Sequence, residues 1–141
     1  MINETLKLTG QVTVLLNGRV VHKINNLVVT DGKEYVASRI KDASSTVMSH
    51  MAVGTGSTAA GSSDSALGAE TGRVALTSTS VAGAAVTYAA TFPAGTGSGA
   101  LAEAAILNGS SGGTMLCRTV FSVVNKQAAD AMTIQWTVSA S

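Results

Sequence analysis

The strongest constraint in this sequence is an alternation of apolar and polar residues that recurs along most of the chain. It is clearest near the C-terminus, where four apolar residues alternate with polar ones: Met132, Ile134, Trp136 and Val138. Successive side chains of a strand point to opposite faces, so this pattern predicts strands with one buried face. About eight to ten such segments, separated by turn residues every eight to twelve positions, predict a mainly β fold with one short helix, either an antiparallel β-sandwich or a barrel.

Residues 4–29 are predicted to form a β-hairpin. The first arm has apolar residues at a period of two, which turns them to one face: Leu6, Leu8, Val12, Val14 and Leu16. Asn17-Gly18 follows directly, and both residue types tolerate the positive φ angles of a type I′ turn. A second extended run, "RVVHKI", completes the hairpin.

The helix is expected over residues 31–41, in "TDGKEYVASRIKD". Thr30 or Asp31 can cap it, and Asp31 with Glu34 has the spacing of a capping box. Val36 and Ile40 begin a stripe that would face the sheet. A helix of about three turns must be held by packing rather than by its own propensity.

Sandwich strands are expected between residues 47 and 139, within one domain that covers the whole chain, 1–141. Val47, Met51 and Val53 are predicted to share one side of a strand, with His50 on the other. Residues 73–80 and 84–92 are predicted to pair as two strands. The aromatic residues fall at inward-facing positions, so we expect them in the core: Tyr35, Tyr88, Phe92, Phe121 and Trp136.

Charge is scarce in this chain and unevenly distributed. Only 12% of the residues are charged, the net charge is +1, and nine Lys and Arg are scattered among eight Asp and Glu. Nucleic acid is therefore not an expected partner, because phosphate binding needs a clustered basic face. Between Ala43 and Cys117 the charged residues are Asp64, Glu70, Arg73 and Glu103. This middle region is either a contact surface, since interface centres are depleted in charge, or a neutral solvated sheet.

No membrane association is expected either. The apolar runs are too short or too interrupted to span a bilayer, and the first ten residues lack the charged start and apolar core of a signal peptide. We expect synthesis in the cytoplasm for these reasons.

The sequence carries no pattern that predicts catalysis, a metal site or a cofactor. The stretch "VGTGSTAAGSSDSALGAETG", residues 53–72, is rich in glycine but lacks the lysine and the following helix of a phosphate-binding loop. Its small residues instead suit a close approach to another backbone, whether of a partner protein, a second copy or its own sheet. No zinc-type or nucleophile-elbow motif occurs, so we expect a protein that is not an enzyme.

Individual reactive residues have structural interpretations. Cys117 is alone and lies in an apolar context, which favours a small buried residue over a reactive thiol. His22 is expected to face solvent on its strand, and His50 to be packed or hydrogen-bonded. Glu70 and Arg73 are predicted to form an ion pair within or between subunits.

Several strings resemble a known class of proteins. These are "AVGTG", "ALGAE", "TFPAGTGSG", "GGTMLCRTVF" and "TIQWTV", spread over about residues 47–139. They resemble small structural proteins of tailed bacteriophages, and most nearly the jelly-roll cement proteins, which decorate the phage head. This resemblance implies a jelly-roll-like antiparallel β-sandwich. No catalytic residue is implied by this resemblance.

The resemblance implies a structural virion protein on the outer surface of the capsid. Such a protein would bind the phage major capsid protein, bridge neighbouring subunits and stabilise the shell. It would also contact copies of itself, with a dimer favoured over a trimer. Lys7, Arg19 and Lys23 are candidate contacts to an acidic capsid surface. The alternative is a phage tail or baseplate module, including one that binds a receptor.

Overall fold

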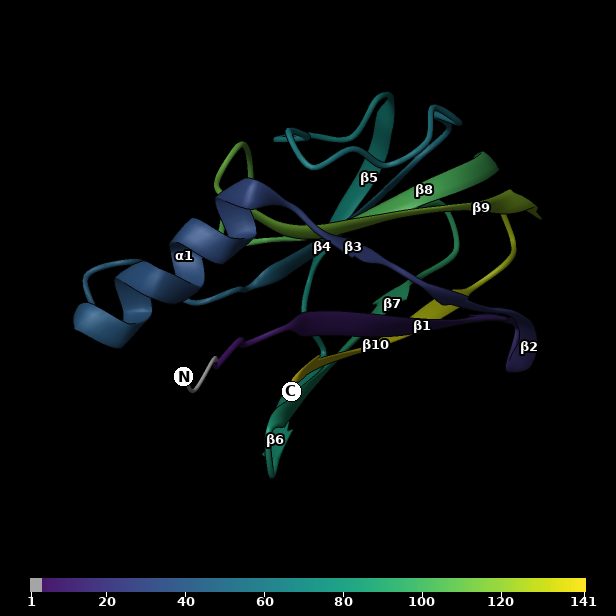
Figure 1. Ribbon diagram of the computed structural model, residues 1–141. Coiled ribbons are helices and arrows are strands. Elements are labelled where there is room, and N and C mark those ends of the chain that lie inside the picture. Colours follow the sequence, from purple (N-terminus) through teal and green to yellow (C-terminus); the bar gives the residue numbers. More distant parts are fainter. Residues whose placement is uncertain (1–3) are drawn as a thin grey trace.

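The computed structural model describes residues 4–141, and within that range ten strands form two antiparallel sheets with one helix beside them (Figure 1). The first sheet has the order β2-β1-β10-β7-β6 and the second has the order β3-β9-β8-β4-β5. The first-sheet strands are β1 (Leu8–Leu16), β2 (Arg19–Asn25), β6 (Ser78–Ala82), β7 (Ala85–Phe92) and β10 (Met132–Ala140). The second-sheet strands are β3 (Leu27–Val28), β4 (His50–Gly54), β5 (Glu70–Ala75), β8 (Gly99–Leu107) and β9 (Met115–Lys126).

Strands from the two ends of the chain pair with each other in both sheets. β1 pairs with β10 in the first sheet, and β3 pairs with β9 in the second, both antiparallel. Strands from the beginning of the chain thus lie beside strands from its end in both layers, as in a jelly roll. The predicted antiparallel β-sandwich of about eight to ten strands with one short helix is confirmed.

The core lies between the two sheets and is built by the alternation seen in the sequence. On β10 the four apolar residues face inward and are buried, while their polar neighbours face outward. The predicted core aromatics Tyr88, Phe92, Phe121 and Trp136 are all buried, and Tyr35 packs at the margin of the same cluster. Burying one such side chain stabilises the fold by about 1.5 to 3 kcal/mol, so this layer supplies much of the driving force.

The first hairpin forms around the predicted turn. Asn17 and Gly18 have φ angles of 50° and 81°, the positive values that a type I′ turn requires. The arms are shorter than the expected range of 4–29, because the first strand begins at Leu8. The prediction for Leu6 was wrong: this residue precedes the strand and is 67% exposed.

The helix α1 (Thr30–Lys41) matches its predicted range, but its predicted cap is wrong. The N-cap residue is Val29, and no side chain caps the helix. Val29 is buried and its amide donates to the Leu116 carbonyl of β9, so the chain enters the helix directly from the sheet. The Thr30 amide donates to the Ser62 carbonyl, which satisfies a further group at this helix end.

Packing of α1 on the sheet is closest at its N-terminal end. A Cβ atom at Gly32 would lie 2.1 Å from the Leu116 carbonyl oxygen, so only glycine allows this approach. Tyr35 and Val36 pack against the core, but Ile40 is 78% exposed, which contradicts its predicted inward position. The helix extends beyond the ends of the strands in Figure 1, and its last turn therefore has no sheet to cover.

Two other expectations about the strands were wrong. Residues 73–80 do not form one strand beside residues 84–92: β5 lies in the second sheet beside β4, and β6 lies in the first sheet beside β7. The chain crosses between the layers at Leu76 and Thr77, whose amides donate to Ser49 and Ala89 respectively. Val47 lies before β4 and is 54% exposed, while Met48 is the buried residue there.

Candidate interaction surface

The outer face of the first sheet is built from uncharged residues. The registers of β1, β10, β7 and β6 place the small and hydroxyl-bearing residues of each strand on this side. We call this surface the neutral face; its residues are Thr9, Gln11, Thr13, Leu15, Ser78, Ser80, Ala82, Ala85, Thr87, Ala89, Thr91, Thr133, Gln135, Thr137 and Ser139. Charge enters only at the margin, where Lys23 of β2 lies opposite Thr13.

Side chains of the neutral face are held in place by one another. The hydroxyls of Thr87 and Thr137 lie 3.1 Å apart across β7 and β10, and those of Thr91 and Thr133 are also 3.1 Å apart. Threonine is β-branched and loses little rotamer freedom when it is covered. A partner on this face would therefore displace few strongly hydrated charges and immobilise few flexible side chains.

The outer face of the second sheet is covered by the glycine-rich segment, residues 55–69, which we call the covering loop. Glu103 of β8 lies beneath it and is fully buried. Its carboxylate accepts backbone hydrogen bonds from Gly56 at 2.5 Å, Gly68 at 2.7 Å and Ala69 at 2.9 Å. A carboxylate with three amide donors is well satisfied although it has left water.

Arg118 of β9 neutralises Glu103 and holds the rest of the covering loop. Its Nη2 atom lies 3.2 Å from Glu103 Oε1, and its Nη1 atom lies 2.9 Å from Asp64 Oδ2. Nη2 also donates to the Thr58 carbonyl, and Asp64 accepts the amide of Gly61. The loop is thus tied at several points to a buried ion pair of its own sheet.

Two of the glycines in residues 53–72 are required by close contacts inside the molecule. A Cβ atom at Gly56 would lie 2.1 Å from Glu103 Oε2, and one at Gly72 would lie 2.7 Å from the Cα atom of Gly97. The sequence left three possible neighbours open for this stretch, and in the structure the chain's own sheet is one of them.

Sequence reasoning missed Glu103 and Arg118 as a pair. The signal available was a single acid in the apolar run "LAEAAIL" and a single base in "LCRTVF". A lone charge in a buried strand requires a partner of opposite sign, which each of these strands supplies to the other.

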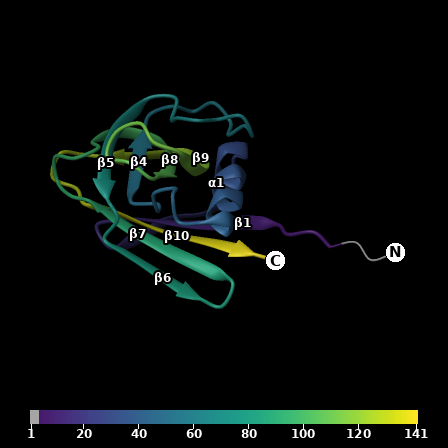
Figure 2. The same ribbon diagram turned by 90° about the vertical axis from the view of Figure 1, so that its left-hand side faces the viewer.

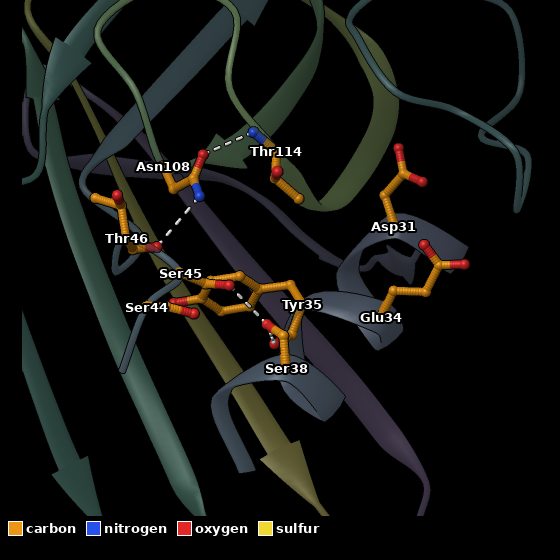
Figure 3. Close-up of a pocket in the computed structure, with 9 residues that line it drawn as sticks. All are labelled: Asp31, Glu34, Tyr35, Ser38, Ser44, Ser45, Thr46, Asn108 and Thr114. Carbon is orange, nitrogen blue, oxygen red and sulfur yellow. Dashed lines mark hydrogen bonds between the residues drawn. The ribbon is translucent and has the colours of Figure 1, made fainter. Parts of the chain in front are cut away.

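A polar groove of about 600 Å³ lies between α1 and the loops that precede β4 and follow β8 (Figure 3). Its Asn108 amide donates to the Thr46 carbonyl and accepts from the Thr114 amide, and the hydroxyls of Ser38 and Ser45 lie 2.8 Å apart. The carboxylates of Asp31 and Glu34 extend from the helix on the other side of the groove. These polar groups hold loops together, and the groove lining contains neither histidine nor cysteine to act as a base or nucleophile.

Glu70 and Arg73 pair within one chain. The guanidinium meets the carboxylate through two hydrogen bonds, of 3.0 Å from Nε and 2.7 Å from Nη2. Nη1 of Arg73 also donates to the carbonyls of Gly109 and Gly112. The pair therefore connects β5 with the turn between β8 and β9.

Lys7, Arg19 and Lys23 are exposed but do not form one patch. Lys7 lies at one end of the first hairpin, where its backbone pairs with Ser141, and Arg19 lies beside the turn at the other end. The register places Arg19 opposite Leu16 and Lys23 opposite Thr13, and these positions lie on different faces of β1. A single flat partner could not contact all three side chains at once.

The cysteine and the histidines are part of the packing. Cys117 is buried as expected, and burial raises the pKa of its thiol, which keeps it protonated. His50 is hydrogen-bonded as expected, with Nδ1 2.8 Å from the Ser49 hydroxyl. His22 is not simply solvent-facing: its ring packs near Phe121 and its Nε2 atom lies 2.7 Å from the Ser122 carbonyl, which links the two sheets.

Within residues 4–141, no three His, Cys, Asp or Glu side chains converge in a way that could hold a metal ion. The one helix in this range is too short and too polar to cross a membrane. Searches of protein-family models, of curated proteins and of solved structures found no match to this chain.

Proposed function

We propose that this chain is a structural virion protein that binds the outer surface of a phage capsid and bridges neighbouring major capsid protein subunits. The observation that carries the proposal is the neutral face, an ordered sheet surface without a charged residue. The resemblance of the strings around the covering loop and in β8 to β10 to phage cement proteins supports the major capsid protein as the partner.

The size of the neutral face suits binding through many weak contacts that are repeated on a lattice. Four strands spaced by about 4.8 Å, with an average length of about 25 Å, present roughly 500 Å². A stable pairwise complex buries about 800 Å² on each partner, so one contact through this face would be weak. On a lattice, many such contacts act together, because each bound copy raises the effective concentration of the next.

A capsid shell is pushed outward by the genome packed inside it, and the structure suits a protein that resists this pressure. A clamp that spans two capsid subunits must transmit force without deforming, and the neutral face is backed by the packed core and fixed by threonine pairs. The exposed cations Lys7, Arg19 and Lys23 would contribute at the margins as separate contacts rather than as a single basic patch.

The test replaces one residue at the centre of the neutral face. Gln135 is exposed and lies between Thr13 and Ala89. Gln135→Arg introduces a charge that binding would bury, so we expect its occupancy on capsids to fall at least about tenfold. Ser111→Arg, in an exposed turn between β8 and β9, is the matched control and should bind normally.

Electron microscopy of particles with and without the protein locates it, and heat or osmotic shock tests its effect on the shell. Head density together with weaker shells in its absence is the expected result. Tail density would instead favour a tail or baseplate module. Normal head occupancy of Gln135→Arg would remove the neutral face from the proposal.

A further inference from the structure

The four edge strands of the two sheets differ in how they resist pairing with another strand. β2 carries Arg19 and Lys23 and is bulged, β5 carries Glu70 and Arg73 and meets a register shift beside β4, and β3 has only two residues. Charges, bulges and shortness are the usual devices that protect an edge. β6 has none of them: its sequence is STSVA, its five residues are all exposed, and its register with β7 is regular.

We propose that β6 is a self-association edge, where it pairs antiparallel with β6 of a second copy of this chain. The proposal concerns the isolated protein and does not depend on binding to a capsid. Figure 2 shows the β6–β7 hairpin at the margin of the first sheet, with β6 outermost. A strand approaching from that side would meet the edge before any other part of the protein.

The hairpin geometry determines which backbone groups face the edge. Ala82 and Ala85 flank a two-residue turn, so they form a pair that exchanges both hydrogen bonds. Such pairs alternate along antiparallel strands, and Ser80 therefore also bonds to β7. Thr79 and Val81 then direct their amide and carbonyl groups outward, where a partner strand can reach them.

A two-fold axis at Ser80 satisfies all four of these groups. Thr79 then lies opposite the partner's Val81, Val81 lies opposite the partner's Thr79, and each facing pair exchanges two hydrogen bonds. Both residues are β-branched, the type that suits cross-strand pairs. The strand is therefore complementary to itself in this register.

The side chain of Val81 gives a second reason for a partner. It lies on the core side of the first sheet, opposite Val86, yet it is 72% exposed because no part of the second sheet covers it. Pairing would place a Thr79 methyl group beside it and would join the two neutral faces into one continuous surface. Such a surface would be about twice as wide as that of one copy.

The interface is small, so its strength in dilute solution is low. Pairing of two five-residue strands through four backbone hydrogen bonds buries far less surface than a stable complex does. We expect a monomer at micromolar concentration and a dimer at concentrations on the order of millimolar. Copies held close together on a particle would reach that regime.

A disulfide across the axis captures this weak pairing. In the proposed register the two Ser80 residues face each other as a close, non-hydrogen-bonded pair, so Ser80→Cys should crosslink two copies under mild oxidation. Ser78→Cys is the matched control, because the two Ser78 residues would lie about 13 Å apart along the strands. The native Cys117 is buried and does not compete.

We expect the purified Ser80→Cys chain to form covalent dimers at least about tenfold faster than the Ser78→Cys chain. Adding Val81→Lys to Ser80→Cys should slow the reaction by a similar factor, because a charged edge resists pairing. Thermal unfolding of each variant checks that all remain folded, as their exposure predicts.

The unmodified protein provides an independent measurement. The amide resonances of Thr79 and Val81 should shift with protein concentration up to the millimolar range, while those of Ser78 and Ser80 shift less. Equal crosslinking of the two cysteine variants, concentration-independent amides, or capture of a capsid protein strand in place of a second copy would each overturn the proposal. Failure of capsid binding alone would leave it intact.

Discussion

Arg118 and Glu103 lie on neighbouring strands with their side chains in contact, 3.2 Å from Nη2 to Oε1, and neither reaches solvent. Both project from the outer face of the second sheet, where a charged residue would ordinarily meet water. The covering loop takes the place of that water. It supplies three amide donors to the carboxylate, and one carboxylate and one carbonyl acceptor to the guanidinium.

Removing the charge of Glu103 should be strongly destabilising. Glu103→Gln turns an NH₂ group toward the backbone donors and leaves Asp64 as the remaining charged partner of the buried Arg118, which costs roughly 3 kcal/mol. Urea unfolding measures the change. Glu70→Gln breaks a more exposed pair and should cost less than about 1 kcal/mol. Equal effects of the two variants would show that burial of the Glu103 pair is not what matters.

Hydrogen exchange in the covering loop provides a second test of the Glu103–Arg118 pair. In Glu103→Gln the amides of Gly56, Gly68 and Ala69 lose their charged acceptor. Their hydrogen exchange should become at least about tenfold faster, whereas core amides of β10 should change only as global stability changes. Unchanged exchange at all three amides would contradict the proposed anchoring.

Steric limits within the covering loop can be tested with two alanines. Gly56→Ala would place a Cβ atom against Glu103 Oε2, so it should cost roughly 1 to 3 kcal/mol. Gly61→Ala, in the same loop, would meet Asp64 Oδ1 at an ordinary 3.6 Å and should be nearly neutral. Chemical denaturation of both variants compares them directly, and a larger cost at Gly61 would refute this account.

The turn of the first hairpin has two separable contributions at Asn17. Its φ of 50° is unfavourable for most residues, and its side-chain amide also donates to Asp130 and accepts from the Ala131 amide. Asn17→Gly keeps the backbone freedom and loses the hydrogen bonds, while Asn17→Ala loses both. We expect Asn17→Ala to be the less stable of the two by about 1 kcal/mol in thermal unfolding. The reverse order would assign no role to the positive φ.

Alkaline pH should destabilise the fold through two buried groups. Burial raises the pKa of the Cys117 thiol, and it raises the pKa of Tyr88 from 10 to about 12. Above pH 9 the unfolded thiol loses its proton and the folded one keeps it, so the unfolded state is favoured as pH rises. Each group contributes a slope of about 1.4 kcal/mol per pH unit between its unfolded and folded pKa values.

Urea midpoints between pH 7 and pH 11 measure this slope. The decline should begin near pH 9 and steepen above pH 10, when Tyr88 joins. Cys117→Ala should remove the decline between pH 9 and pH 10, although it lowers stability at neutral pH by leaving a small cavity. A decline that begins at pH 9 in that variant too would rule out the thiol as its cause.

Local patterns predicted the strands and the first turn because their causes are local. The alternation in β10 and the Asn17-Gly18 pair act over a few residues, and both appear in the structure as expected. The helix cap failed because a tertiary contact, from the Val29 amide to Leu116, replaced the side-chain cap. The division of residues 73–80 between the two sheets depends on which strands lie beside them, and alternation carries no information about that.

The interaction surfaces were harder to predict from the sequence than the core. A shortage of charge between residues 43 and 117 was compatible with a contact surface or with a neutral solvated sheet, and it could not separate the neutral face from the covering loop. The structure gives Gly56 a close internal contact, whereas most of the loop's other small residues are exposed. Much of the neutral face comes instead from β1 and β10, which lie outside that region.

The anchoring of the covering loop leaves its outward side chains free to change. Apart from Asp64, every attachment to Glu103 and Arg118 is made by a main-chain amide or carbonyl. The exposed side chains of Ser57 and Ser65 could therefore be exchanged for others without disturbing the pair beneath. Such a loop can change the chemistry of its outward surface while its backbone stays fixed.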